Sequence, residues 1–313
     1  MSLKIVFLGT PDFAVSVLAT INKSKHAIVG VVTNIDKPAG RGKRLHESAV
    51  KKYALENQLK LLQPEKLKGE EFLASLKRLE ADVFIVVAFR MLPKEVWSIP
   101  RLGTFNLHAS LLPNYRGAAP INWAIINQEK KTGLTTFLID EKIDTGNLLL
   151  QTTVPIGEKE TAGSLHHTLA KLGGDLVEQT LDELEKGILP KPQETDGSEK
   201  EAPKLNKSNT RIDWSAPLDK IDSLIRGLSP YPVAWTKLIQ DKNILPIKIY
   251  ASETEFINHS HTSNQLIVDG KMIKVTHPEG FLVIKEIQLP NKRRMIASDL
   301  LNGYSFSASA VVK

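Results

Sequence analysis

Cysteine is absent from this 313-residue sequence. Disulfide scaffolds, iron–sulfur clusters, thiolate zinc sites and cysteine nucleophiles are therefore excluded. No apolar run approaches the roughly 20 residues that a membrane-spanning helix needs. The first eight residues enter a strand-like segment without the cleavage pattern of a signal peptide. We therefore expect a cytoplasmic protein that is neither secreted nor inserted in a membrane.

The composition is that of an ordinary globular protein, with 42% hydrophobic and 24% charged residues. At roughly 150 residues per domain, the length predicts two domains. There are 41 bases against 35 acids, which gives a net charge of +6. Between Lys37 and Lys52 six bases face one acid, a balance of 6 − 1 = +5. Because nearly all the excess charge lies in one stretch, this stretch is a candidate site for a polyanionic partner.

Strand-like and helix-like segments alternate along the first part of the chain. The apolar patterns predict strands over residues 4–11, 27–33, 59–62, 83–89, 103–108 and 135–139, and helices over 13–21 and 47–57. This alternation predicts an α/β domain with a doubly wound, mostly parallel sheet. We assign residues 1–188 to this domain.

The pattern changes near residue 189. Residues 189–208 are polar, contain proline and show no period, so we expect a linker there. Beyond it, a helix-like segment over 218–228 precedes short strand-like runs at 234–239, 247–251, 265–268, 272–276 and 281–288. Short strands separated by turn residues predict that residues 209–313 form a small β-barrel.

Asn106 and His108 are the first candidate catalytic residues. They lie two positions apart on a predicted strand, so their side chains project from the same face. An amide that donates to an oxyanion beside an imidazole that moves a proton suits carbonyl chemistry. The pair by itself is weak evidence, because a buried histidine near a strand end is more often structural.

Asp144 is the next candidate, in a loop that follows a predicted strand. Its carboxylate could orient the His108 imidazole and raise its proton affinity. Asp144-Thr145-Gly146 also matches the triplet of aspartic proteases, but those enzymes need two such triplets on a β-rich fold. An ordinary turn aspartate is the other alternative.

The glycine-rich segments do not match nucleotide-binding motifs. Residues 9–14 lack G-x-G-x-x-G, and residues 40–44 lack the upstream glycine and the Ser/Thr of a P-loop. A dehydrogenase or an ATPase is therefore disfavoured. The histidine pairs at 166/167 and 259/261 lack the spacing and acidic neighbours of a metal site, so we expect no metal.

The basic stretch begins with a segment, residues 36–44, that the proline and two glycines mark as a flexible loop. Arg41, Lys43 and Arg44 could bind nucleic-acid phosphates from it. The alternative is a solvated loop that is rich in lysine without a binding role.

Taken together, these motifs resemble the methionyl-tRNA formyltransferases over essentially the whole chain. Residues 106–120 and 143–146 are shared with folate-dependent formyltransferases generally, whereas 38–43 is more particular to the tRNA enzymes; residues 7–14 match as well. The resemblance implies formyl transfer from 10-formyltetrahydrofolate to methionyl initiator tRNA, with no metal. It also implies a formyltransferase Rossmann-like catalytic domain followed by an OB-like tRNA-binding barrel.

The resemblance assigns roles to individual residues. Asn106, His108 and Asp144 would be catalytic, and the basic loop would reach the acceptor stem through Arg41, with Lys43 and Arg44 beside it. The folate-contacting turn would consist of Ser110, Leu111, Leu112 and Pro113.

One segment departs from the family pattern. Phe89-Arg90-Met91 stands where the family has Tyr-Gly, so the local folate contacts are in question.

Three other functions remain open at this level. A small-amine formyltransferase or a formyltetrahydrofolate hydrolase would use the same three residues but would not need the second domain. A catalytically silent tRNA-binding protein would not need the three residues. We expect a monomer, because no exposed apolar stripe stands out in the sequence.

Overall fold

The computed structural model describes residues 2–39 and 44–313. The chain forms two compact units, each assembled from separate stretches. The first unit comprises residues 1–117, 132–155 and 166–201, and the second comprises 118–131, 156–165 and 202–313. The domain boundaries expected from the sequence, 1–188 and 209–313 with a linker between them, stay a prediction.

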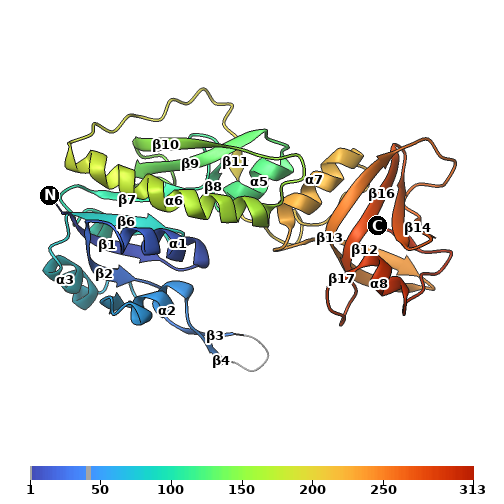
Figure 1. Ribbon diagram of the computed structural model, residues 1–313, viewed down its shortest axis with the longest axis horizontal. Helices are drawn as coiled ribbons and strands as arrows, with labels where there is room; N and C mark the ends of the chain where they lie inside the picture. Colours follow the sequence, from blue (N-terminus) through green and yellow to red (C-terminus); the bar gives the residue numbers. More distant parts are fainter. Residues whose placement is uncertain (1, 40–43) are drawn as a thin grey trace. The chain divides into compact units, whose positions relative to one another are not determined.

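A seven-stranded sheet forms the centre of the first unit, in the order β10-β9-β7-β6-β1-β2-β5 (Figure 1). Its strands are β1 (Lys4–Gly9), β2 (Ala27–Val32), β5 (Leu61–Leu62), β6 (Val83–Val87), β7 (Thr104–His108), β9 (Lys131–Leu138) and β10 (Leu148–Pro155). The five strands from β5 to β7 are parallel, and β9 is antiparallel to β7. The mostly parallel sheet predicted from the sequence is confirmed.

Helices cover both faces of this sheet. They are α1 (Asp12–Ile21), α2 (Ala49–Glu56), α3 (Glu70–Arg78), α4 (Lys94–Trp97) and α6 (Ala162–Glu185). On one face, Phe72 and Leu76 of α3 and Val96 of α4 pack in one core cluster with apolar strand residues. On the other face α6 lies so close that a Cβ at Gly173 would be 2.9 Å from Leu107 Cδ2. The sheet is therefore doubly wound.

The order of the strands fixes where a ligand can bind. From β1 the chain passes to β2 and β5 on one side of β1. It then returns to β6, which lies on the other side of β1. Ligands of doubly wound sheets bind in the crevice at this reversal, beyond the carboxyl ends of the strands. The loops after β1, β6 and β7 border that crevice.

The segment predicted as a loop over residues 36–44 begins and ends in β-structure. Strands β3 (Lys37–Ala39) and β4 (Arg44–His46) pair in antiparallel register, with Lys37 opposite His46. The loop prediction was wrong at these two ends, because proline and glycine content does not reveal backbone pairing between flanking residues. Proline is compatible with such a ribbon, because an edge strand leaves one backbone side unpaired.

The second unit contains a nearly closed antiparallel barrel, as the sequence predicted. Its strands are β12 (Ala234–Gln240), β13 (Asn243–Phe256), β14 (Leu266–Asp269), β15 (Met272–His277), β16 (Gly280–Gln288), β17 (Met295–Ile296) and β18 (Val311–Val312). Six of them follow the order β14-β15-β16-β13-β12-β18, and β17 pairs with β16 outside this path. A bridge between Gln265 and Val311 links the two ends of the path. Strand β13 extends beyond the predicted 247–251 in both directions.

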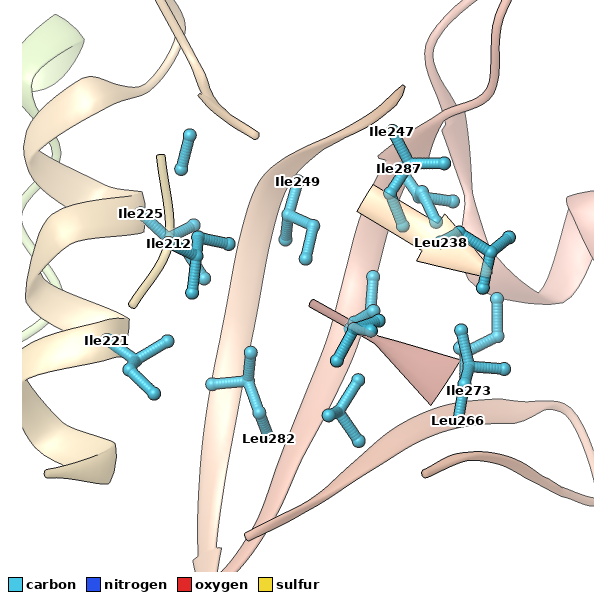
Figure 2. Packing of buried hydrophobic residues seen from close by; sticks show 14 of the residues in the cluster. Ile212, Ile221, Ile225, Leu238, Ile247, Ile249, Leu266, Ile273, Leu282 and Ile287 are labelled. Atoms are coloured by element: carbon cyan, nitrogen blue, oxygen red, sulfur yellow. The ribbon is translucent and has the colours of Figure 1, made fainter. Parts of the chain in front are cut away.

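Helix α7 (Leu218–Leu228) covers part of the barrel core. Its buried residues Leu218, Ile221, Ile225 and Leu228 recur at helical spacing on one face. Figure 2 shows Ile221 and Ile225 pointing from this helix toward the strands that carry Ile249 and Leu282. The remaining elements are α5 (Pro120–Ile126), α8 (Ala297–Leu301) and the short pair β8 (Arg116–Gly117) and β11 (Glu201–Ala202).

Candidate active site

Asn106 and His108 lie at the carboxyl end of β7, an internal strand of the sheet. Asn106 pairs with Val86 of β6, which faces the α3 and α4 side, so both candidate side chains project from that face. Within the described part of the chain, the Asn106 side chain makes no hydrogen bond and is partly exposed. Its amide is therefore available to a ligand.

The buried ring of His108 has a polar group beside each of its nitrogens. Its Nε2 lies 2.8 Å from the carbonyl oxygen of Tyr115, and its Nδ1 lies 3.8 Å from Oδ2 of Asp144. Because a carbonyl only accepts, Nε2 carries the hydrogen. In the neutral ring Nδ1 then holds the lone pair, on the side that faces Asp144. Protonation of Nδ1 would create a charged donor next to the carboxylate.

Asp144 reaches His108 because its loop folds back over β7. Strand β9 ends at Leu138, which pairs with Phe105, yet the carboxylate of Asp144 contacts His108 three residues further along β7. The backbone N–H of Gly117 donates to Oδ2 of Asp144 at 2.9 Å and helps to fix its orientation. Asp144 has a φ of 55°, a conformation that aspartate tolerates better than most residues.

Gly146 makes this tight return possible. A Cβ at this position would lie 1.7 Å from the carbonyl oxygen of Leu138, so the loop approaches the end of β9 too closely for any other residue. The sequence Asp144-Thr145-Gly146 thus has a structural reason in this fold. It is a tight turn that brings a carboxylate to a histidine.

The turn from Ser110 to Pro113 is held from two neighbouring strands. The Thr135 hydroxyl donates to the Ser110 carbonyl at 2.6 Å, and the Leu112 N–H donates to that hydroxyl at 3.2 Å. The side-chain amide of Gln151 on β10 donates to the Leu112 carbonyl at 2.9 Å. The backbone of the turn is therefore fixed before any ligand arrives.

The four candidate folate-binding residues differ in exposure. Leu112 is 3% exposed and Ser110 is fully buried, with its hydroxyl donating to the Asn114 carbonyl at 2.7 Å. Leu111 and Pro113 are partly exposed. A flat ring could therefore contact Leu111 and Pro113, whereas the side chains of Ser110 and Leu112 serve the turn itself.

Arg90, which departs from the family pattern, binds backbone carbonyls of the protein itself. Its guanidinium donates to the carbonyl oxygens of Pro64 at 2.6 Å and Glu65 at 3.3 Å. Partial burial lowers the pKa of this guanidinium relative to its usual value. Arg90 thus joins the loop after β6 to the loop after β5.

The basic loop is only partly covered by the structure. Arg41 and Lys43 lie outside the described residues, and Arg44 is described only as a backbone position in β4. Lys51, which contributed to the charge count of this region, is paired with Asp36 and, at 2.8 Å, with Glu47. The hydrogen bond from Lys51 lowers the pKa of Asp36. Lys51 therefore adds little to any phosphate-binding surface.

Two residues with a place in the site were not anticipated from the sequence. The Tyr115 carbonyl fixes the His108 tautomer, and Gln193 donates to the backbone of the Asp144 loop. The contact made by a backbone carbonyl cannot be inferred from a pattern of side chains. For Gln193, the prolines at 190 and 192 favour extended backbone, the conformation in which Lys191 forms its isolated bridge with Leu148.

The described residues contain neither a metal-binding cluster nor a helix that could span a membrane. Residues 2–39 and 44–313 contain no group of three histidine, aspartate or glutamate side chains placed to hold a metal ion. None of their helices combines the length and apolar character that crossing a membrane requires.

Comparison with known proteins shows the family to which this chain belongs. Residues 3–181 match the family model described as "Formyl transferase", and residues 204–305 match "Formyl transferase, C-terminal domain". The two matches together make the chain a formyltransferase. The chain is 54% identical to the methionyl-tRNA formyltransferase of Flavobacterium johnsoniae over 99% of both proteins. It is 47% identical to that of Bacteroides fragilis, over 99% of this chain and 98% of the relative. The chain belongs to the methionyl-tRNA formyltransferase family.

Solved structures show the same fold at lower sequence identity. HypX from Aquifex aeolicus, in complex with tetrahydrofolic acid, matches 96% of this chain and 47% of its own length, with a TM-score of 0.65 and 17% identity. The sugar 3N-formyl transferase WlaRD matches 94% of this chain and 100% of its own, with a TM-score of 0.64 and 23% identity. The chain thus spans about half the length of HypX.

Proposed function

We propose that Asn106, His108 and Asp144 are the residues with which this methionyl-tRNA formyltransferase transfers a formyl group from 10-formyltetrahydrofolate to methionyl initiator tRNA. The observation that carries the residue assignment is the convergence at the end of β7. His108 lies 3.8 Å from Asp144 and shares a strand face with Asn106, which is partly exposed. The relatives that match over nearly their full length are named methionyl-tRNA formyltransferases.

The chemistry follows from these groups. The α-amino nitrogen of the methionyl ester attacks the formyl carbon, and a new C–N bond forms as the carbonyl oxygen becomes an oxyanion. Asn106 donates to that oxyanion, and protonated His108 stabilises its charge. Asp144 accepts the proton that the amine loses, directly or through water. The bond from the carbon to the folate nitrogen then breaks, and the proton that Asp144 accepted is passed to that nitrogen, directly or through water, which leaves tetrahydrofolate and the formylated tRNA.

The folate would lie in the crevice at the reversal of strand order, beside the turn of residues 110–113. Leu111 and Pro113 offer partly exposed apolar surface, and Ser110 and Leu112 keep the backbone of the turn in place. No metal is required by this mechanism. We place the reaction in the cytoplasm, where translation begins, and we expect the enzyme to act as a monomer.

Binding of tRNA is expected to weaken steeply with salt, since phosphate contacts displace counterions. Affinity for methionyl initiator tRNA should fall about tenfold or more between about 50 and 200 mM salt if several phosphates are neutralised. Titration by filter binding or fluorescence at several salt concentrations measures the slope. A flat response would indicate a small-molecule acceptor.

Arg41 is expected to contact the acceptor stem. Arg41→Ala should raise the apparent KM for tRNA about tenfold and leave the KM for the folate donor unchanged, because one charge-assisted phosphate contact is lost. The salt slope should fall by about one, as for a single phosphate contact. Lys77→Ala, which removes an exposed lysine on helix α3, is the control. A normal tRNA KM in Arg41→Ala would make the loop a solvated segment without a binding role.

A further inference from the structure

The segment after α6 is attached to the edge of the catalytic sheet. Lys191 forms an antiparallel bridge with Leu148 at the start of β10, with Leu148 N to Lys191 O at 2.7 Å and Lys191 N to Leu148 O at 2.9 Å. In antiparallel register, two residues after Lys191 stand opposite two residues before Leu148. Gln193 is therefore opposite Gly146, in the loop that carries Asp144.

The side-chain amide of Gln193 both donates and accepts hydrogen bonds. Its Nε2 donates to the carbonyl oxygens of Asp144 and Gly146, each at 2.9 Å. Its Oε1 accepts from the Arg116 guanidinium, at 3.2 Å from Nε and 2.5 Å from Nη2. Because the guanidinium only donates and the carbonyls only accept, a single orientation of the amide satisfies all four contacts.

These contacts connect Gln193 to the backbone of Asp144 and to the segment whose N–H binds the Asp144 carboxylate. Gln193 binds the backbone carbonyl of Asp144 itself, and through Arg116 it contacts the residue next to Gly117, whose N–H donates to Asp144 Oδ2. Without Gln193, the two carbonyls would lose their donor in a loop that already holds Asp144 at a φ of 55°. The 3.8 Å approach of Asp144 to His108 would then no longer be fixed.

We infer that Gln193 is a positioning residue for formyl transfer, which fixes Asp144 against His108 from a segment outside the sequence motifs of the family. The inference rests on the proposed function, since it assigns Gln193 to the carboxylate that accepts the amine proton. Gln193 does not touch the reacting atoms. Its effect is therefore expected in kcat, with little change in the KM for the folate donor.

The test is a double-mutant cycle between Gln193 and Asp144. Gln193→Leu should lower kcat about 10- to 100-fold, as misplacement of a catalytic group does. In an Asp144→Asn background the same change should cost less than about twofold, because the carboxylate that it positions is gone. Gln193→Glu should be as slow as Gln193→Leu: it still accepts from Arg116 but places an acceptor against two carbonyls. The exposed neighbour Glu194→Ala is the control.

Hydrogen exchange separates this inference from the proposed function. The Gly117 amide should exchange faster in Gln193→Leu than in wild type or Glu194→Ala, whether or not the enzyme accepts methionyl-tRNA. Faster exchange together with the expected cycle supports the role. Unchanged Gly117 exchange, a normal kcat in Gln193→Glu, or an equal loss with and without Asp144 would overturn it. A wild-type enzyme that does not formylate methionyl-tRNA would refute the proposed function instead.

Discussion

His108→Ala is expected to lower kcat for formyl transfer about 100-fold or more, the range expected when a charge-stabilising and proton-moving group is lost. The imidazole is buried and held between the Tyr115 carbonyl and Asp144, so no neighbouring side chain among these contacts replaces it. Steady-state kinetics with saturating methionyl-tRNA and folate donor measures the loss.

His167→Ala is the matched control, because His167 is an exposed histidine on α6. Its kcat should equal that of the wild type. Circular dichroism and the melting temperature establish whether each variant is folded. A folded His108→Ala enzyme with near-normal turnover would remove His108 from the mechanism.

Asp144→Asn is expected to reduce kcat by a similar factor, about 100-fold, because it removes a charge and a proton acceptor while preserving shape. The asparagine oxygen can still accept from the Gly117 N–H, which donates to Oδ2 of Asp144 at 2.9 Å. The loop should therefore keep its conformation, and any loss is chemical. Single-turnover rates at saturating substrate report it directly.

Glu141→Gln is the control for this variant. Glu141 lies in the same loop, and its carboxylate is exposed and paired with Lys94 at 2.8 Å. Removing its charge should leave kcat within about twofold, the scale of an exposed ion pair. If both variants retain full activity, neither Asp144 nor Glu141 takes part in catalysis.

The fold was largely predictable because its elements follow local patterns. Apolar runs and helical spacing predicted the strands β1, β2, β6 and β7 and, with the same bounds, helix α7. Strand β10 and the short pair β8 and β11 were missed. Their residues carry no strong alternation, and β8 and β11, at residues 116–117 and 201–202, are far apart in the sequence.

The residues of the candidate site, whose catalytic roles stay a prediction, were chosen from side-chain motifs. Asn106, His108 and Asp144 could be read from motifs, but their distances could not, because the loop after β9 folds back only in the context of Gly146 and Leu138. Arg90 shows the same limit. From the sequence alone, Arg90 put the local folate contacts in question. In the structure its guanidinium binds the carbonyls of Pro64 and Glu65.

The measurement that tests the central claim most directly is single-turnover transfer of labelled formyl from 10-formyltetrahydrofolate. Methionyl initiator tRNA, glycinamide ribonucleotide and water are offered in parallel as acceptors. Our account predicts label on the aminoacyl-tRNA, with a rate that falls about 100-fold in both His108→Ala and Asp144→Asn. Label on the ribonucleotide, or released as formate, would contradict the assigned acceptor.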